Sequence, residues 1–226
     1  MHSLRLRVGI VHGSGGDIKP IATARTPART PAPSPVHAFW VSAGVVALAE
    51  IGDKTQLLAL LLAARYRRPV PVIAGITVAT LANHALAGLV GAWITHLLGP
   101  LLLRALLGLG FIAMGAWALV PDKPDGGPVG RAGLGAFAAT LLAFFLVEMG
   151  DKTQLATAML AARYTPLAAV ILGTTSGMLL ADAPAVLLGE RVTRVLPLPL
   201  VRRVAAALFV LLGLATLLGA GSMLGL

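Results

Sequence analysis

A seven-residue motif occurs twice in this chain, and its repetition constrains the fold more than any other feature. Residues 50–56 read E-I-G-D-K-T-Q and residues 148–154 read E-M-G-D-K-T-Q, 98 positions later. Over 17 residues from Glu50 to Tyr66, the same offset gives 12 identities. The offset persists without a gap in the pairs Gly75/Gly173, Thr77/Thr175, Gly91/Gly189, Arg104/Arg202, Phe111/Phe209 and Gly115/Gly213. The chain therefore consists of two copies of one unit.

Each copy lies in strongly apolar sequence. Hydrophobic residues make up 57% of the chain and charged residues only 12%, about half of the share in soluble domains. Six apolar segments, separated by Pro, Gly and Arg, each approach the ~20 residues that a helix needs to cross a bilayer. They span residues 37–64, 70–96, 101–120, 131–162, 166–190 and 200–224. This pattern predicts an all-α integral membrane protein with six transmembrane helices.

The repeat determines how these helices are expected to be arranged. Three helices per copy is an odd number, so the second copy enters the membrane from the opposite side. We therefore predict two inverted three-helix repeats, at residues 37–120 and 131–226, joined by a linker at 121–130. Lys and Arg number nine in the odd-numbered loops and two in the even-numbered loops, which places both termini outside the cytoplasm. If the five basic residues before the first helix are added to the side of the even-numbered loops, the Lys and Arg counts of the two sides become nine and seven.

Residues 1–36 have a different composition, with five basic residues, one acid and a Thr/Ala/Pro-rich stretch. We expect a disordered tail here. An organelle transit peptide and a misassigned start codon are the alternatives. The net charge of +9 does not indicate nucleic-acid binding, because the basic residues lie between apolar segments without interleaved stacking aromatics. Cysteine is absent, which excludes disulfides and thiolate metal sites, and we expect no resident cofactor.

The motif places charged side chains deep in the first and fourth segments. Together with one acid in the fifth segment they make seven ionisable groups, which would cost on the order of 17–25 kcal/mol if all faced lipid unpaired, so they must face one another or water. They are Glu50, Asp53, Lys54, Glu148, Asp151, Lys152 and Asp182. On a continuous helix, Asp53 lies 60° from Glu50 and Gln56 extends the same face. Gly52 and Gly150 would permit either close helix crossing or local unwinding.

This donor set predicts a site for a hard divalent cation, Ca²⁺, Mg²⁺ or Mn²⁺, because it offers carboxylate and amide oxygens without thiolates. The candidate ligands are Glu50, Asp53, Gln56, Glu148, Asp151 and Gln154. Supporting or proton-coupling roles are predicted for Thr55, Thr153, Lys54, Lys152 and the matching pair His84 and Asp182. The structural alternative is that the motif holds the bundle together by salt bridges within each copy, Glu50 with Lys54 and Glu148 with Lys152. It leaves the aspartates unexplained.

At these residues the sequence resembles the Gdt-type cation/proton exchanger family, whose hallmark is two copies of E-x-G-D-K-[ST] in an inverted three-plus-three helix protein. The resemblance covers residues 38–225 and maps the family's cation-binding acids onto Glu50, Asp53, Glu148 and Asp151. The family includes bacterial manganese exporters and Golgi and chloroplast Mn/Ca exchangers. The short central loop resembles that of the bacterial branch, which implies a multi-pass protein of the bacterial inner membrane.

The resemblance implies a secondary transporter, not an enzyme, that expels Mn²⁺ or Ca²⁺ in exchange for protons. A carboxyl group withdrawn from water takes up a proton, and a bound dication displaces it, so the same acids can supply the coupling. A passive cation channel or a subunit of a membrane complex is the alternative. An intramembrane aspartyl hydrolase, suggested by the two Gly-Asp pairs, is a remote one, because such enzymes carry no adjacent Lys in each copy.

Overall fold

The computed structural model describes residues 34–120, 134–189 and 197–219, and the regular structure in these ranges is α-helical. In chain order the helices are α1 (Pro35–Glu50), α2 (Lys54–Tyr66), α3 (Pro69–Leu97), α4 (Pro100–Ala118), α5 (Ala136–Glu148), α6 (Lys152–Arg163), α7 (Leu167–Leu188) and α9 (Leu198–Leu217). The predicted tail up to residue 33 and the predicted linker at 121–130 lie outside the described residues. The all-helical fold class is confirmed for the part of the chain that is described.

The two segments that carry the motif are not continuous helices, so this part of the prediction is wrong. The expected helix at 37–64 is divided into α1 and α2, and the one at 131–162 into α5 and α6. The break falls at the glycine of each motif, because Gly52 and Gly150 both adopt a φ of +82°. Glycine enters this region without the steric cost that a Cβ brings. The second of the two roles considered for these glycines, local unwinding, is the one observed.

Proline explains where several of the other helices begin. It lacks an N–H and has its φ fixed near the helical value, so it is tolerated in the first turn. Prolines stand at the first or second position of α1, α3, α4 and α9. Two boundaries differ from prediction for this reason: α1 begins at Pro35, inside the segment assigned to the tail, and α9 begins at Leu198, before Pro199.

Four of the described helices, α3, α4, α7 and α9, are long and apolar enough to cross a membrane. The helices α1 and α5 are apolar but shorter, with 16 and 13 residues. A helix of 16 residues is about 24 Å long at 1.5 Å per residue, less than the ~30 Å of a hydrocarbon core. Neither of these two helices is long enough to cover that distance alone.

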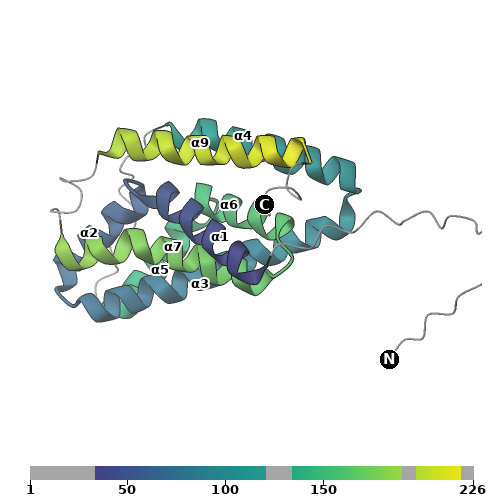
Figure 1. The fold of residues 1–226 in the computed structure, drawn as a ribbon. Helices are drawn as coiled ribbons and strands as arrows, with labels where there is room; N and C mark the ends of the chain where they lie inside the picture. Colours follow the sequence, from purple (N-terminus) through teal and green to yellow (C-terminus); the bar gives the residue numbers. More distant parts are fainter. Residues whose placement is uncertain (1–33, 121–133, 190–196, 220–226) are drawn as a thin grey trace, which may run out of the picture. The chain divides into compact units, whose positions relative to one another are not determined.

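In each repeat, the helix before the motif packs against the long helix that follows the motif in the other repeat. A Cβ at Gly173 of α7 would lie 2.5 Å from the Phe39 carbonyl of α1, and one at Gly75 of α3 would lie 2.8 Å from the Phe137 carbonyl of α5. Both pairs are related by the 98-residue offset. The α1–α7 and α3–α5 crossings can be followed in Figure 1. Because only glycine leaves room for such an approach, the repeated glycines explain this exchange of partners.

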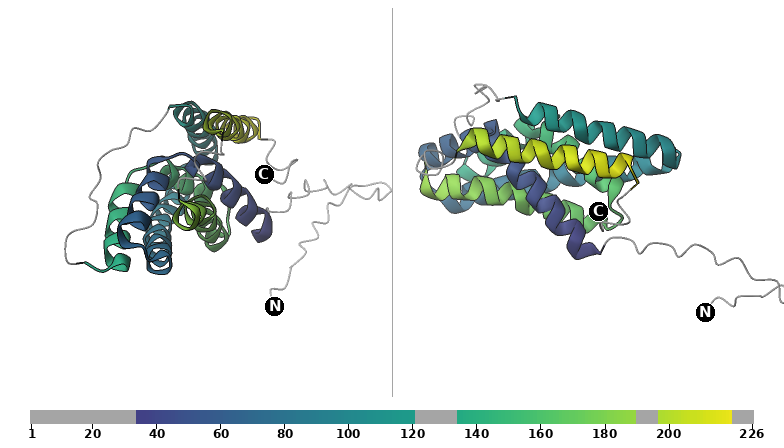
Figure 2. Two further views of the ribbon diagram at one scale, coloured as in Figure 1. Left: turned by 90° about the vertical axis from the view of Figure 1, so that its left-hand side faces the viewer. Right: turned by 45° about the horizontal axis from the view of Figure 1, so that its top comes forward.

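The third helices of the repeats, α4 and α9, pack against each other. A Cβ at Gly115 would lie 2.9 Å from the Ala206 carbonyl, and one at Gly213 would lie 2.6 Å from the Gly108 carbonyl. Residue numbers rise along α4 as they fall along α9, so the two helices are antiparallel. Figure 2 shows them side by side in both views. Matching phenylalanines, Phe111 and Phe209, stack between them with ring centroids 6.4 Å apart.

Candidate functional site

The backbone of each motif holds its acids at the junction of two short helices. The N–H of Asp53 donates to the Glu50 carbonyl at 3.0 Å, and the N–H of Asp151 donates to the Glu148 carbonyl at 3.1 Å. Each aspartate is then the N-cap of the helix that follows, α2 or α6. A helix N-terminus carries partial positive charge, which favours a carboxylate at this position. Each glutamate, in turn, is the last residue of the helix before the break.

The glutamine of each motif binds the backbone of the glycine at the break. The Oε1 atom of Gln56 accepts from the N–H of Gly52 at 3.0 Å, and the Oε1 atom of Gln154 accepts from the N–H of Gly150 at 2.6 Å. Sequence reasoning considered these amide oxygens only as cation ligands. In the structure each binds the backbone of its own motif, and its second lone pair remains as acceptor capacity. The retention of Gln in both copies thus has a local structural reason.

Acids from both repeats meet at one place. Glu50, Asp53 and Asp151 each contribute one carboxylate oxygen to a cluster in which the oxygens lie within 4.8 Å of one another, and all three residues are buried. We call these three residues the acid cluster. Hard divalent cations are bound by carboxylate oxygens, so three such oxygens at this spacing suit part of a coordination shell. The predicted approach of the two motifs is therefore seen for three of the four motif acids.

The fourth motif acid, Glu148, is buried beside the acid cluster but is not one of the three residues that form it. Its Oε2 atom accepts from the hydroxyl of Thr80 on α3 at 3.4 Å. Asp182 of α7 is fully buried and lies near enough to interact electrostatically with Glu50, Asp53 and Glu148. Within the described residues, neither Asp182 oxygen has a hydrogen-bond partner. The structure thus brings all five predicted acids into one buried region.

Each motif lysine forms an ion pair with the aspartate of the other repeat. Lys54 Nζ lies 3.4 Å from Asp151 Oδ1, and Lys152 Nζ lies 3.6 Å from Asp53 Oδ2. The alternative prediction, pairs of each lysine with the glutamate four residues before it, assumed an unbroken helix and does not describe these bridges. In the structure the glutamate and the lysine of each motif lie on different helices, on either side of the break.

The remaining predicted side chains differ between the two halves. The hydroxyl of Thr55 donates to Glu50 Oε2 at 2.5 Å. The matching hydroxyl of Thr153 is buried and, within the described chain, has no hydrogen-bond partner. His84 is buried on α3 at the position that matches Asp182, and neither of its ring nitrogens is hydrogen-bonded in the described chain.

His84 and Asp182 were predicted to contribute from α3 and α7, but the hydrogen bonds that these two helices make to the motif segments were not anticipated from sequence. Thr80 stands one turn before His84 on α3, so the i,i+4 spacing of two polar residues in an apolar helix was a usable signal. The amide of Asn83 donates to the Phe145 carbonyl at 3.1 Å, and Nε2 of Gln56 donates to the Ala181 carbonyl at 3.0 Å. Residues 83 and 181 are related by the repeat offset. These bonds attach each broken helix to a long helix of the other repeat.

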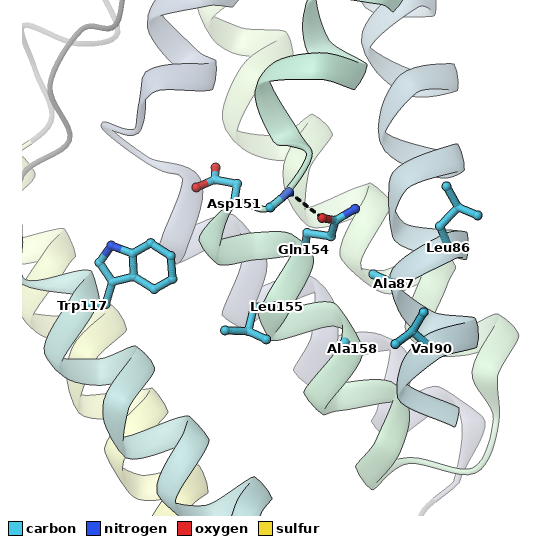
Figure 3. Close-up of a pocket in the computed structure, with 9 residues that line it drawn as sticks. Leu86, Ala87, Val90, Trp117, Asp151, Gln154, Leu155 and Ala158 are labelled. Carbon is cyan, nitrogen blue, oxygen red and sulfur yellow. Dashed lines mark hydrogen bonds between the residues drawn. The ribbon is translucent and has the colours of Figure 1, made fainter. Parts of the chain in front are cut away.

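A pocket of about 430 Å³ opens at the second motif. It is lined by Leu86, Ala87, Val90, Trp117, Gly150, Asp151, Gln154, Leu155 and Ala158. Figure 3 shows Leu86 and Val90 of α3 on one side of α6 and Trp117 of α4 on the other. Most of the lining is apolar, and the only carboxylate and side-chain amide in it, from Asp151 and Gln154, belong to the motif. The pocket therefore reaches one member of the acid cluster, Asp151.

Comparison with known proteins supports the same interpretation. The family model described as "Divalent cation/proton antiporter GDT1" matches residues 38–126 and 136–224, one match in each repeat. A protein of Vibrio cholerae serotype O1, named "Putative manganese exporter", is 52% identical over 177 residues, which cover 78% of this chain and 88% of the relative. No solved structure matches the chain.

Proposed function

Because this chain belongs to the divalent cation/proton antiporter GDT1 family, we propose that it exports Mn²⁺ from the cytoplasm in exchange for protons. The observation that carries this proposal is the acid cluster, in which two oppositely placed motifs supply buried oxygens within 4.8 Å of one another. Such a cluster is costly in an apolar protein unless a cation or protons neutralise it.

Membership of the family has two direct consequences. The protein is a multi-pass membrane transporter and not an enzyme. This overturns the remote alternative of an intramembrane aspartyl hydrolase. The site residues are accordingly interpreted as cargo ligands and coupling groups.

The proposed ligands are Glu50, Asp53, Glu148 and Asp151, with Gln56 and Gln154 at the periphery. Asp182 lies beside them and would contribute a further negative charge. Oxygen donors of this kind suit Mn²⁺ and Ca²⁺ alike. The name of the Vibrio cholerae relative favours manganese, and we therefore give Mn²⁺ as the principal cargo and Ca²⁺ as the second.

We further propose six membrane crossings in two inverted repeats, in which α1 with α2 and α5 with α6 each make one crossing. The register of α1 on α7 supports this topology. Gly173 approaches Phe39 and Gly177 approaches Ala43, so the two helices run in the same direction. The first and fifth crossings of a six-helix protein have that relation. The arginines at the end of α2 and directly after it, Arg65, Arg67 and Arg68, then lie in the cytoplasm, with both termini outside the cytoplasm.

Exchange for two protons would make export electrically neutral. Moving two positive charges outward against a potential of 100 mV costs about 4.6 kcal/mol, at roughly 2.3 kcal/mol for each charge. Two protons returning cancel this cost. The acids that release the dication are then free to accept protons, so one buried site is sufficient for both cargoes.

Access to the site would alternate between the two sides of the membrane. The pocket at Asp151 supports this step, because the second motif is open to it while Leu198 lies against the first motif. A relative movement of the two repeats would exchange the open and the closed motif.

The test is transport by the purified protein in liposomes under an imposed pH gradient. We expect Mn²⁺ uptake that depends on the gradient, Ca²⁺ uptake at a lower rate, and no uptake by the Glu50→Gln variant. Metal flux that is independent of the pH gradient would favour a passive channel. Absence of metal flux in the wild-type protein would refute the proposed function.

A further inference from the structure

Two ion pairs connect the two repeats at the site. Each joins the lysine of one motif to the aspartate of the other motif. Each lysine stands directly after the aspartate of its motif, and each contacts the aspartate of the other motif. The distances, 3.4 Å for Lys54 with Asp151 and 3.6 Å for Lys152 with Asp53, are nearly equal. The two bridges are therefore one contact repeated by the symmetry of the chain.

Helix stability does not explain lysine at these positions. Lys54 and Lys152 are the first residues of α2 and α6, where the partial positive charge of the helix disfavours a cation. What both positions have in common is the approach to the aspartate of the opposite repeat.

Those aspartates are two of the three members of the acid cluster. An ammonium group within 4 Å of a carboxylate oxygen competes with any other cation for that oxygen. We propose that Lys54 is a tethered cation that neutralises part of the acid cluster when no cargo is bound and leaves it when the divalent cation enters. The proposal deepens the proposed function and rests on it.

The two lysine side chains differ in exposure, and therefore in how easily each can move away from the aspartate that it pairs with. The Lys54 side chain is 24% exposed, whereas that of Lys152 is 7% exposed. Lys54 also pairs with Asp151, the acid that the pocket reaches. A flexible lysine side chain at the edge of the buried region can swing its ammonium toward solvent at low cost. Lys54 is therefore assigned the mobile role, and Lys152 remains in place.

This role has a specific consequence for affinity. A competitor attached to the protein weakens cargo binding at equilibrium and helps to expel the cargo from the site. Removing its charge should tighten cargo binding and slow release. A lysine that only stabilised the fold would have the opposite effect, because its loss would disturb the ligands and weaken binding.

The experiment compares Mn²⁺ binding by wild-type protein, Lys54→Gln, Lys54→Arg and Arg68→Gln, each purified in detergent. Arg68 is exposed in the loop before α3, so its variant removes one positive charge away from the site. We expect Lys54→Gln to bind Mn²⁺ roughly two- to fivefold more tightly, the effect of a partly exposed ion pair. Lys54→Arg and Arg68→Gln should bind like the wild type. In liposomes, Lys54→Gln should show a lower KM and a lower maximal rate.

A second measurement uses the wild-type protein alone and does not depend on a variant that folds. Saturating Mn²⁺ should increase the rate at which Lys54 is modified by an amine-reactive reagent, because the cation releases the ammonium from Asp151. Unchanged or slower modification would overturn the proposal, as would equal or weaker Mn²⁺ binding by Lys54→Gln. In both cases wild-type Mn²⁺ transport would leave the proposed function intact. A wild-type protein that neither binds nor transports Mn²⁺ would overturn both.

Discussion

Gly52 and Gly150 have the same φ of +82°, yet they have different surroundings. A Cβ at Gly52 would lie 2.8 Å from a methyl group of Leu198, while one at Gly150 would have nothing within 4 Å. The first motif is thus covered by the start of α9, and the second opens into the pocket. A nearly identical sequence fixes the same backbone in both copies but does not fix what lies against it.

The ends of the long helices contribute to this difference. Gly91, near the end of α3, packs directly on the backbone of Ala158 in α6. Its equivalent, Gly189, follows the end of α7 and would have nothing within 4 Å of a Cβ. The two halves are therefore related by symmetry in their crossings at Gly75 and Gly173 but not at this end of the helices. Such a departure from symmetry is what an alternating-access carrier is expected to show in any one state.

The largest expected effect tests whether both motifs serve one site. Glu50→Gln and Glu148→Gln should each reduce Mn²⁺ transport by about 100-fold or more. Removing one partner of a buried charge interaction costs roughly 3–5 kcal/mol of interaction free energy. Transport in liposomes measures the loss, and size-exclusion chromatography in detergent verifies folding. A small loss for Glu148→Gln alone would restrict the binding site to the acid cluster.

The second prediction concerns the motif glycines. Alanine at either position should destabilise the protein, since a left-handed conformation costs an L-residue roughly 1–2 kcal/mol. Gly52→Ala should lower the melting temperature more than Gly150→Ala, because its Cβ also meets Leu198. Thermal unfolding in detergent measures both. Adding Leu198→Ala should recover the difference between them, and equal melting temperatures would contradict the described contact.

The third prediction tests the difference in access. The chain contains no cysteine, so single cysteines can be placed at Gln56 and Gln154 without a background. Gln154→Cys should react with a water-soluble thiol reagent at least about tenfold faster, because Gln56 is buried and must wait for the structure to open. Labelling rates followed by mass spectrometry measure this. Equal rates would mean that both motifs are open to water to the same extent.

The smallest expected effect concerns the motif threonines. Thr55→Val removes a hydroxyl that donates to Glu50 and should cost about 1 kcal/mol of stability. Thr153→Val removes a hydroxyl without a hydrogen-bond partner in the described chain and should be nearly neutral in stability. Unfolding in denaturant compares the two. If Thr153→Val keeps its stability but loses transport, the free hydroxyl is a cargo ligand.

Most of the helices could be predicted from the sequence, because apolar length and proline positions determine them locally. The predicted segments 70–96 and 101–120 differ from α3 and α4 by two residues or fewer at either end. The breaks at residues 51–53 and 149–151 could not be predicted in this way, since a single glycine in a helix is compatible with either close crossing or unwinding. The choice between these two roles depends on partners from the other repeat.

The site, too, could be predicted only in part from the sequence. That Glu50, Asp53 and Asp151 belong together followed from the cost of isolated charges in an apolar protein. Which oxygens approach one another did not follow, because a continuous helix was assumed. The contributions of Thr80 and Leu198 were also missed, since both come from helices that lack the motif.

The sequence by itself determined that this is a helical membrane protein with two matching halves and a buried set of acids, because composition and repetition are properties of the chain alone. Only the tertiary structure decided that each lysine pairs with the aspartate of the opposite half, and that one motif is covered while the other is open. These are relations between segments about 100 residues apart, and their energies depend on how the two halves pack.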